Sequence, residues 1–236
     1  MGSEATLKLP VIDFTNLKLE ANNPNWEAVK SQVHKALVDY GCFEAIFDKV
    51  PLELRKAIFA ALQELFDLPL QTKILNVSKK PYHGYVGQYP MVPLFETIQS
   101  FSEQLSELDQ IIRKMILESL GVEEYLEEHM NSTNYLLRVM KYKGPQTSDT
   151  KLGLAWSNGR LHSPFHRVIM SGNEARYSAG LFSIPKGGSI IKAPEELVDE
   201  EHPLLFKPFD HVEFLKSYYT EQGQRDQSAL RTYCGV

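Results

Sequence analysis

Hydrophobic residues recur at helical spacing in the first third of the chain. Residues 26–40 carry one apolar face behind Asn25, a residue type that favours the helix N-cap, and Gly41 supplies a stop. A second apolar face begins after Pro51, which suits a first helical turn, and ends at Pro69. We predict helices over both segments. Their inward residues are Val29, Val33, Leu37 and Tyr40 in the first and Leu54, Ile58, Leu62 and Leu65 in the second.

A longer amphipathic pattern covers residues 97–120 and ends at Gly121. A shorter, acidic helix is expected to follow it through Glu128, where His129 at the helix end would be favourable as a cation. Residues 76–96 are rich in Pro, Gly and Tyr and indicate an extended connector. The predicted inward positions of the long helix are Leu105, Leu108, Ile112, Met115 and Ile116.

Short runs of β-branched and aromatic residues predict strands. The runs cover residues 9–14, 42–47, 134–142, 165–170 and 176–184. The tail from Pro194 onward is typical of helices and loops, and the chain has no internal repeat. A helix-rich front followed by a β-containing back indicates the α+β class.

Composition and charge narrow the function classes. The 236 residues suffice for one large domain or two small ones, and the net charge is −5 with Lys and Arg scattered among acidic residues. A nucleic-acid-binding surface would show a clustered basic stripe, so no nucleic-acid partner is expected. Cys42 and Cys234 are far apart, which favours a reducing compartment.

No run of about 18 apolar residues occurs, so no membrane span is expected. Residues 1–6 match the loose myristoylation pattern, but one acyl chain binds membranes only marginally. We therefore expect a cytoplasmic, monomeric protein.

His162 and His166 are four positions apart, a spacing that on a helix would suit a shared metal ion. Pro164 lies between them, and on an extended chain the two side chains would be about 13 Å apart. At most one of them is therefore a metal ligand. Farther along, Arg176 and Ser178 would share one face of a strand and could together bind a carboxylate.

Several motifs resemble the plant 2-oxoglutarate/Fe(II)-dependent dioxygenases, closest to the subgroup that modifies glucosinolate side chains. In the second half they are Asn158-Gly159-Arg160, His166-Arg167-Val168, Arg176-x-Ser178 and Phe182-x-x-Pro185, followed by residues 193–199 and 207–210. In the first half they are residues 9–13, 41–43, 68–73 and 84–88. The resemblance implies an N-terminal dioxygenase region over residues 1–96, mostly helical. Over residues 97–236 it implies an incomplete double-stranded β-helix (jelly-roll) core with a C-terminal helix.

The same resemblance implies residue roles. His166 would be the distal histidine of the iron site, and Arg176 would form a salt bridge with the far carboxylate of 2-oxoglutarate. Ser178 and Tyr142 would support that cosubstrate, whereas His162 receives no metal role. The cofactors implied are Fe(II) and 2-oxoglutarate. Intact members hydroxylate or desaturate small plant metabolites while 2-oxoglutarate is decarboxylated to succinate.

The chain departs from the family at the motif that supplies the first two iron ligands. The family supplies one His and one carboxylate from a His-x-Asp motif shortly after the match at residues 152–154, but here Ala155 begins sequence from the far end of the core. The only His-x-acid triplet is His211-Val212-Glu213, in a segment that reads as helix, where the two side chains would diverge by about 200°. A smaller gap lies near residues 95–97. We interpret the main gap as an internal deletion, from exon skipping, a truncated allele or a gene-model error.

We therefore expect a catalytically inactive member of the family, with no residue assigned as catalytic. The alternative is a non-enzymatic remnant that is either a folded partner-binding protein or an unstable product. A third interpretation is a generic α+β binding domain whose motif matches arise by chance. The substrate of intact relatives is set by loops and core side chains, many of them in the missing segment.

Overall fold

The structure is a computed structural model that describes residues 8–17, 24–73, 75, 93–142, 155–164, 174–226 and 228–236. The expected connector, up to residue 92, and the expected strand 165–170 with His166 lie outside the described residues. The helices are α1 (Trp26–Asp39), α2 (Leu52–Asp67), α3 (Leu70–Lys73), α4 (Pro93–Leu120), α5 (Leu126–Asn131), α6 (His211–Tyr218), α7 (Glu221–Arg225) and α8 (Ala229–Cys234). The strands are β1 (Val11–Asp13), β2 (Glu44–Ile46), β3 (Thr133–Tyr142), β4 (Arg176–Pro185), β5 (Ile190–Ile191) and β6 (Phe209–Asp210). Short 3-10 turns are η1 (Glu123–Tyr125), η2 (Ala155–Ser157) and η3 (Glu195–Leu197).

The helices expected in the first half are confirmed, with shifted ends. Pro51 is the N-cap of α2 rather than part of its first turn, and α4 begins at Pro93, inside the expected connector. Proline at a first helical position has a preset backbone angle and lacks only an N–H that the helix would leave unpaired, which explains the earlier start. The acidic helix continues to Asn131. Gly41 and Gly121 end helices with φ of 71° and 68°, as their positions predicted.

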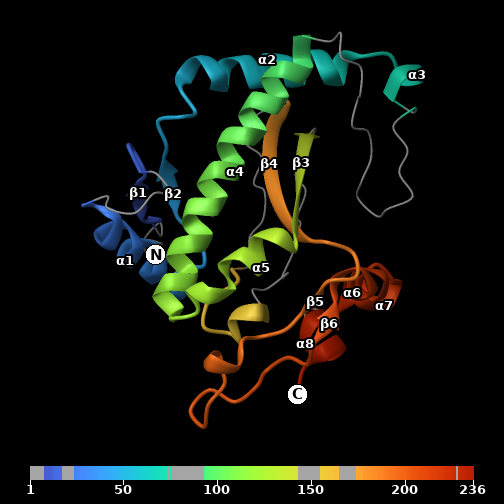
Figure 1. Cartoon of the computed structure of the whole chain (residues 1–236). Coiled ribbons are helices and arrows are strands. Elements are labelled where there is room, and N and C mark those ends of the chain that lie inside the picture. The colour runs from blue at the N-terminus through green and yellow to red at the C-terminus, as the bar shows by residue number, and fades with distance from the viewer. Residues whose placement is uncertain are drawn as a thin grey trace, which may run out of the picture.

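The main core joins the N-terminal elements to α4. Val33 of α1 and the residues Ile111 and Met115 of α4 are fully buried, together with Ile12 and Phe14 from the β1 region. Each such side chain contributes about 1.5–3 kcal/mol of hydrophobic free energy when it leaves water. The core therefore fixes α4 as the central helix, which runs diagonally through the molecule in Figure 1.

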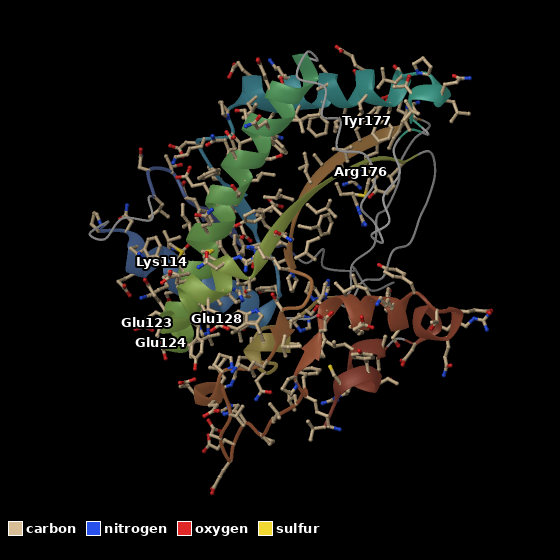
Figure 2. The ribbon with its side chains drawn as sticks, turned by 45° about the vertical axis from the view of Figure 1, so that its right-hand side comes forward. Lys114, Glu123, Glu124, Glu128, Arg176 and Tyr177 are labelled. Carbon is tan, nitrogen blue, oxygen red and sulfur yellow. The ribbon has the colours of Figure 1, made fainter. Side chains whose placement is uncertain are left out.

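β3 and β4 form the longest sheet, an antiparallel pair with Thr133 opposite Pro185 at one end and Tyr142 opposite Arg176 at the other. The pair lies beside α4, and α2 crosses near the end of β4 that carries Arg176 (Figures 1 and 2). The other sheets are the parallel pair β1–β2 and the antiparallel pair β5–β6. In the described parts of the chain no sheet exceeds two strands, so this part of the jelly-roll core is incomplete.

A second cluster covers the C-terminal end. Phe209 and Phe214 pack edge to face with ring centroids 5.9 Å apart, and Cys234 is buried beside them. The helices expected after Pro194 are confirmed by α6, α7 and α8, and the short strand β6 in this tail, which pairs with β5 just before it, was not expected. Among the described helices, none is long and apolar enough to span a bilayer.

Candidate functional site

The β3–β4 register brings the three predicted cosubstrate residues together. Tyr142 is directly opposite Arg176, and Met140 is directly opposite Ser178. Directly opposite residues project to the same face, with Cβ atoms about 4.5–5.5 Å apart, and residues two apart on a strand share that face too. We call the face carrying the even-numbered residues of β3 and β4 the site face. It gathers Tyr142, Arg176 and Ser178 around Met140.

The two hydroxyl groups of this cluster have donor capacity that the described residues hardly use. The Ser178 Oγ atom is buried and has no hydrogen-bond partner in the part of the chain that the structure describes. Among the described residues the Tyr142 hydroxyl donates to the Met140 Sδ atom, at 3.1 Å, and a thioether is a weak acceptor. A buried hydroxyl without a partner costs about 1–3 kcal/mol. The site face therefore presents donors that an incoming anion could satisfy.

Arg176 supplies the charge of this cluster. Its side chain is exposed, and no described carboxylate forms an ion pair with it. In Figure 2 Arg176 projects to the side of β4 away from α2, while Tyr177 lies toward that helix. A guanidinium presents a planar pair of N–H donors that matches the two oxygens of a carboxylate.

A cation that sequence reasoning did not select lies farther along the same face. Arg138 is opposite Gly180, and its guanidinium carbon is 5.3 Å from the centre of the Phe182 ring. Phe182 itself is 44% exposed. Strand alternation backwards from Tyr142 would have placed Arg138 on the site face, so the signal was present in the sequence.

The opposite face of the sheet is held by helices, which fixes the direction of the site face. Tyr177 packs on Phe66 of α2, with ring centroids 5.9 Å apart. Lys141 lies 5.2 Å from the Tyr177 ring centre and 3.6 Å from the Asp67 carboxylate. Because α2 and α4 cover this face, Arg176 and Ser178 are directed away from the helices.

α4 is joined to the sheet by a polar network around Asp109. This carboxylate accepts hydrogen bonds from the Arg113 Nε atom at 2.6 Å, from the Tyr135 hydroxyl at 2.8 Å and from the Ser183 hydroxyl at 2.8 Å. Burial, together with the negative charge of Asp109, raises the pKa of Tyr135 to about 12. Sequence reasoning missed this network, although the four-residue spacing of Asp109 and Arg113 on a helix is a recognisable ion-pair signal.

His129 belongs to the same network, and the expectation that it is cationic is wrong. Its Nδ1 atom accepts from the Arg113 guanidinium at 3.0 Å, and its ring packs edge to face against Trp156 with centroids 4.8 Å apart. Burial and the positive charge of Arg113 lower the pKa of His129 to about 4. The ring is therefore neutral near pH 7, because these contacts outweigh the favourable helix end.

The donor set of the described residues does not fit an iron site. They contain no group of three His, Cys, Asp or Glu side chains that could hold a metal ion. His211 and Glu213 lie in the first turn of α6, as expected, and their helical spacing prevents them from sharing an ion. His166 lies outside the described residues, so its role as the distal ligand stays a prediction.

The segment that carries Asn158 and His162 is structural. The His162 backbone N–H donates to the Leu37 carbonyl at 2.9 Å, which ties this segment to the end of α1. The buried Asn158 side chain donates to the Leu197 carbonyl at 3.1 Å and accepts from the Leu205 N–H at 2.9 Å. The Asn-Gly-Arg motif thus organises the C-terminal loop, and the side chains of the cosubstrate cluster come from β3 and β4 instead.

Comparison with known proteins places the chain in a family. A family model described as "non-haem dioxygenase in morphine synthesis N-terminal" matches residues 9–106. The chain is 42% identical to the "Probable 2-oxoglutarate-dependent dioxygenase AOP1.2" of Arabidopsis thaliana, across 97% of this chain and 96% of the relative. The chain belongs to the 2-oxoglutarate-dependent dioxygenases. The subgroup that the sequence motifs resemble, to which the AOP proteins belong, is confirmed by this relative.

Solved structures of other dioxygenases have the same fold as this chain. The chain matches the dioxygenase for auxin oxidation in rice with a TM-score of 0.77 at 22% identity, covering 97% of this chain and 100% of that one. It matches JOX2, solved in complex with 2OG, Fe and JA, with a TM-score of 0.71 at 19% identity, covering 98% of this chain and 90% of that one. The mixed helical and jelly-roll fold is thereby confirmed, and Fe(II) and 2-oxoglutarate are the cofactors of this family.

Proposed function

We propose that this chain is a catalytically inactive 2-oxoglutarate-dependent dioxygenase that keeps the carboxylate-binding part of the site and lacks most of the iron-binding part. The single observation that carries the proposal is the contrast between two sets of residues. Tyr142, Arg176 and Ser178 share one face of the β3–β4 pair. Against this, the chain has no His-x-acid motif ahead of His166, where the family places its first two iron ligands.

One imidazole is a poor iron site. Fe(II) bound by two His and a carboxylate has three open positions for cosubstrate and oxygen, and the anionic carboxylate offsets part of the ion's charge. His166 alone provides neither the charge nor the fixed geometry. The chain is therefore expected to carry out no catalytic step.

The missing ligands belong to a missing piece of chain. The alignment with AOP1.2 extends over 308 positions, more than the 236 residues of this chain, so the relative contains residues that have no counterpart here. The abrupt passage from Leu154 to Ala155 is where we propose the deletion. By this account intact relatives hydroxylate or desaturate small metabolites and convert 2-oxoglutarate to succinate, whereas this chain does not.

Succinate formation tests the proposal. The purified chain is incubated with Fe(II), ascorbate and 2-oxoglutarate, with the Arabidopsis AOP1.2 protein assayed in parallel as an intact relative. We expect no succinate above the protein-free background, because the ligand set cannot hold the metal. Iron binding at micromolar strength together with succinate release would overturn the proposal.

The alternative is a remnant without enzymatic function, either a folded partner-binding protein or an unstable product. The incomplete jelly-roll favours instability, because strands at an open sheet edge promote aggregation. A thermal melt followed by far-UV circular dichroism separates the two cases. A cooperative transition supports a retained domain, and a melt without one supports an unstable product.

The proposal extends to the location, oligomeric state and domain division of the chain. We propose a cytoplasmic monomer with no nucleic-acid or membrane partner, divided near residue 96 into an N-terminal dioxygenase region and the incomplete core. The net charge of −5, without a clustered basic stripe, supports the exclusion of nucleic acid. Size-exclusion chromatography with light scattering tests the monomer, and a dimeric mass would contradict it.

A further inference from the structure

We infer that Asn158-Gly159 is a site of spontaneous deamidation, that the closed loop of residues 197–205 suppresses the reaction, and that the product prevents this loop from closing again. The step is the only Asn-Gly pair in the sequence. The modification limits the lifetime of the fold and does not depend on the proposed inactivity. It gives Asn158 a chemical fate in addition to its structural role.

Deamidation at an Asn-Gly pair needs no enzyme, cofactor or oxidant. The Gly159 backbone nitrogen gives its proton to hydroxide and forms a bond to the Asn158 Cγ atom. The Cγ–Nδ2 bond then breaks, and the Nδ2 nitrogen takes up a proton and leaves as ammonia. Water opens the resulting cyclic imide at either carbonyl, which gives aspartate or isoaspartate. Glycine favours this ring closure because no Cβ obstructs its nitrogen and its backbone rotates freely.

The turn itself requires this labile pair. Asn158 and Gly159 have positive φ of 49° and 79°, and asparagine and glycine are among the residues that adopt this left-handed region most readily. A Cβ on Gly159 would lie 2.7 Å from the Leu205 Cδ1 atom, so a larger residue would have to displace that side chain. A substitution that removes the chemical weakness therefore also strains the turn.

Hydrogen bonds fix the Asn158 amide in the folded chain. Its Nδ2 atom lies 3.1, 3.3 and 3.2 Å from three carbonyl oxygens of the loop 197–205. Its Oδ1 atom accepts from the Leu205 N–H at 2.9 Å, and the residue is only 3% exposed. Ring closure would have to rotate the Cγ atom toward the Gly159 nitrogen and would break these bonds together.

The same surroundings oppose the departure of ammonia. The Asn158 Nδ2 atom must gain a proton before it leaves, and the three carbonyl oxygens beside it have no proton to donate. Burial also separates the amide from the hydroxide and water that the reaction consumes. Deamidation therefore proceeds from molecules in which the loop has opened, and its rate follows the population of that open state.

The products cannot return to the closed loop. Aspartate turns a negative oxygen toward the three carbonyls in place of an N–H donor, and a buried charge without a partner is strongly unfavourable. Isoaspartate also lengthens the backbone by a methylene group, in a turn where Gly159 already lies close to Leu205. A transient opening thus becomes permanent once the amide has reacted.

Asp199 holds the loop 197–205 closed independently of Asn158. Its carboxylate accepts from the His202 N–H at 2.7 Å and forms an ion pair with the Arg160 Nη2 atom at 3.5 Å. Asp199→Ala should therefore increase the population of the open loop, while the reacting pair itself stays unchanged.

Peptide mapping of the full-length chain measures the conversion. Trypsin releases residues 152–160, in which Asn158 is the only amide side chain, and chromatography with mass spectrometry separates the asparagine, aspartate and isoaspartate forms. Folded chain and chain in guanidinium chloride are incubated in parallel at the same neutral pH and temperature. We expect conversion to be at least about tenfold slower in the folded chain, which corresponds to an opening free energy of about 1.4 kcal/mol or more.

Asp13→Ala is the matched control for Asp199→Ala. The Asp13 carboxylate accepts from the Thr15 N–H at 2.8 Å, so a local hydrogen bond of the same type is lost at the end of β1. In the folded state Asp199→Ala should convert at least about threefold faster than the parent, and Asp13→Ala should convert at the parent's rate. In guanidinium chloride all three chains should convert equally fast.

Urea unfolding of aged protein tests the permanent opening. A folded sample is aged until a large part of Asn158 has reacted, and its unfolding curve is compared with that of fresh protein. We expect a second transition at lower urea concentration, with an amplitude that follows the converted fraction from peptide mapping.

Three results would overturn the inference. Equal conversion of the folded and the denatured parent would show that the fold gives no protection, and this comparison needs no variant that could fail to fold. Equal folded-state rates of the parent and Asp199→Ala would show that the loop 197–205 does not control the reaction. A single unfolding transition in converted protein would show that the loop closes over the product. The succinate assay of the proposed function is unaffected by any of the three.

Discussion

Asp109 on α4 accepts a hydrogen bond from Ser183 on β4, with their side-chain oxygens 2.8 Å apart, although 74 residues separate them in sequence. The same carboxylate accepts from Tyr135 on β3 and from Arg113 one helical turn away. One side chain thus connects both β3 and β4 to the central helix α4. Because the opposite face of those strands carries Arg176, this anchor also sets the direction of the proposed carboxylate site.

Asp109→Ala should lower the free energy of unfolding by about 2–4 kcal/mol. The reason is that Arg113, whose side chain is only 12% exposed, would keep its charge and its bond to His129 but lose the carboxylate that balances this charge. Urea unfolding followed by circular dichroism measures the effect. Glu213→Ala is the matched control, because its pair with Lys216 is more than half exposed on both sides and should cost less than about 1 kcal/mol. Equal losses in the two variants would contradict the anchoring role.

His129 should make the protein acid-sensitive between about pH 6.5 and pH 4. Its pKa is lowered from 6.5 to about 4 in the folded state, so on acidification the unfolded chain takes up this proton first. The contribution to stability is complete above pH 6.5, decreases as the pH falls, and reaches a loss of about 3 kcal/mol near pH 4. His129→Gln removes the titrating group and should flatten this part of the stability curve.

The measurement is the urea midpoint of parent and variant at intervals from pH 7 to pH 4. Burial also lowers the pKa of His211, so a smaller slope of the same sign should remain in His129→Gln and disappear when His211→Gln is added. The carboxyl groups with lowered pKa, such as Asp210, titrate below the ordinary value of 3.8 and act at lower pH. Parallel curves for parent and His129→Gln would refute the assignment.

Gly41→Ala should destabilise the protein much more than Gly121→Ala. Both glycines have positive φ, 71° and 68°, so alanine at either carries a backbone cost of about 1–2 kcal/mol. A Cβ on Gly41 would also lie 2.3 Å from the His162 carbonyl oxygen, whereas a Cβ on Gly121 would meet no atom within 4 Å. The closer approach adds a steric penalty of at least about 1 kcal/mol.

Thermal denaturation of the two single variants compares these positions directly. The difference between their Tm values reports the steric term, because the backbone cost is shared. If the Tm decreases by the same amount in both variants, the segment carrying His162 does not pack against the end of α1 as the structure describes.

Sequence patterns predicted much of the local structure because local rules determine it. Apolar spacing and glycine stops predicted α1, α2 and most of α4, and strand alternation placed Arg176 and Ser178 on one face. The cross-strand pairing of Tyr142 with Arg176 could not be derived in this way. Register between distant strands depends on the intervening chain and on the helices beneath, which local spacing does not encode.

Long-range contacts also explain the wrong interpretation of His129. Its place at the end of α5 suggested a favourable cation, and this would hold for an isolated helix. The Trp156 ring and the Arg113 guanidinium are far from it in sequence and reverse the preference. The same holds for Asn158, which the motif indicated as part of the family signature without revealing its structural role.

Asn158→Asp tests that structural role. The Asn158 amide nitrogen lies 3.1, 3.3 and 3.2 Å from the carbonyl oxygens of Leu197, His202 and Pro203, and the residue has a φ of 49°. Aspartate keeps the acceptor for the Leu205 N–H but turns a second negative oxygen toward three carbonyls. We expect a loss of about 2–4 kcal/mol at pH 7, because the donor is removed and a charge is buried.

The pH dependence of Asn158→Asp sharpens the test. Repulsion by the carbonyls and burial should raise the folded-state pKa of the new carboxyl, so its destabilisation is largest at neutral pH and decreases as the pH falls through that pKa. His202→Ala is the control, since it removes an exposed side chain but keeps the backbone carbonyl, and should cost less than about 1 kcal/mol. Chemical unfolding at pH 7 and pH 5 measures both variants relative to the parent. A loss for Asn158→Asp that is no larger than the control at pH 7 would show that the loop 197–205 does not depend on this amide.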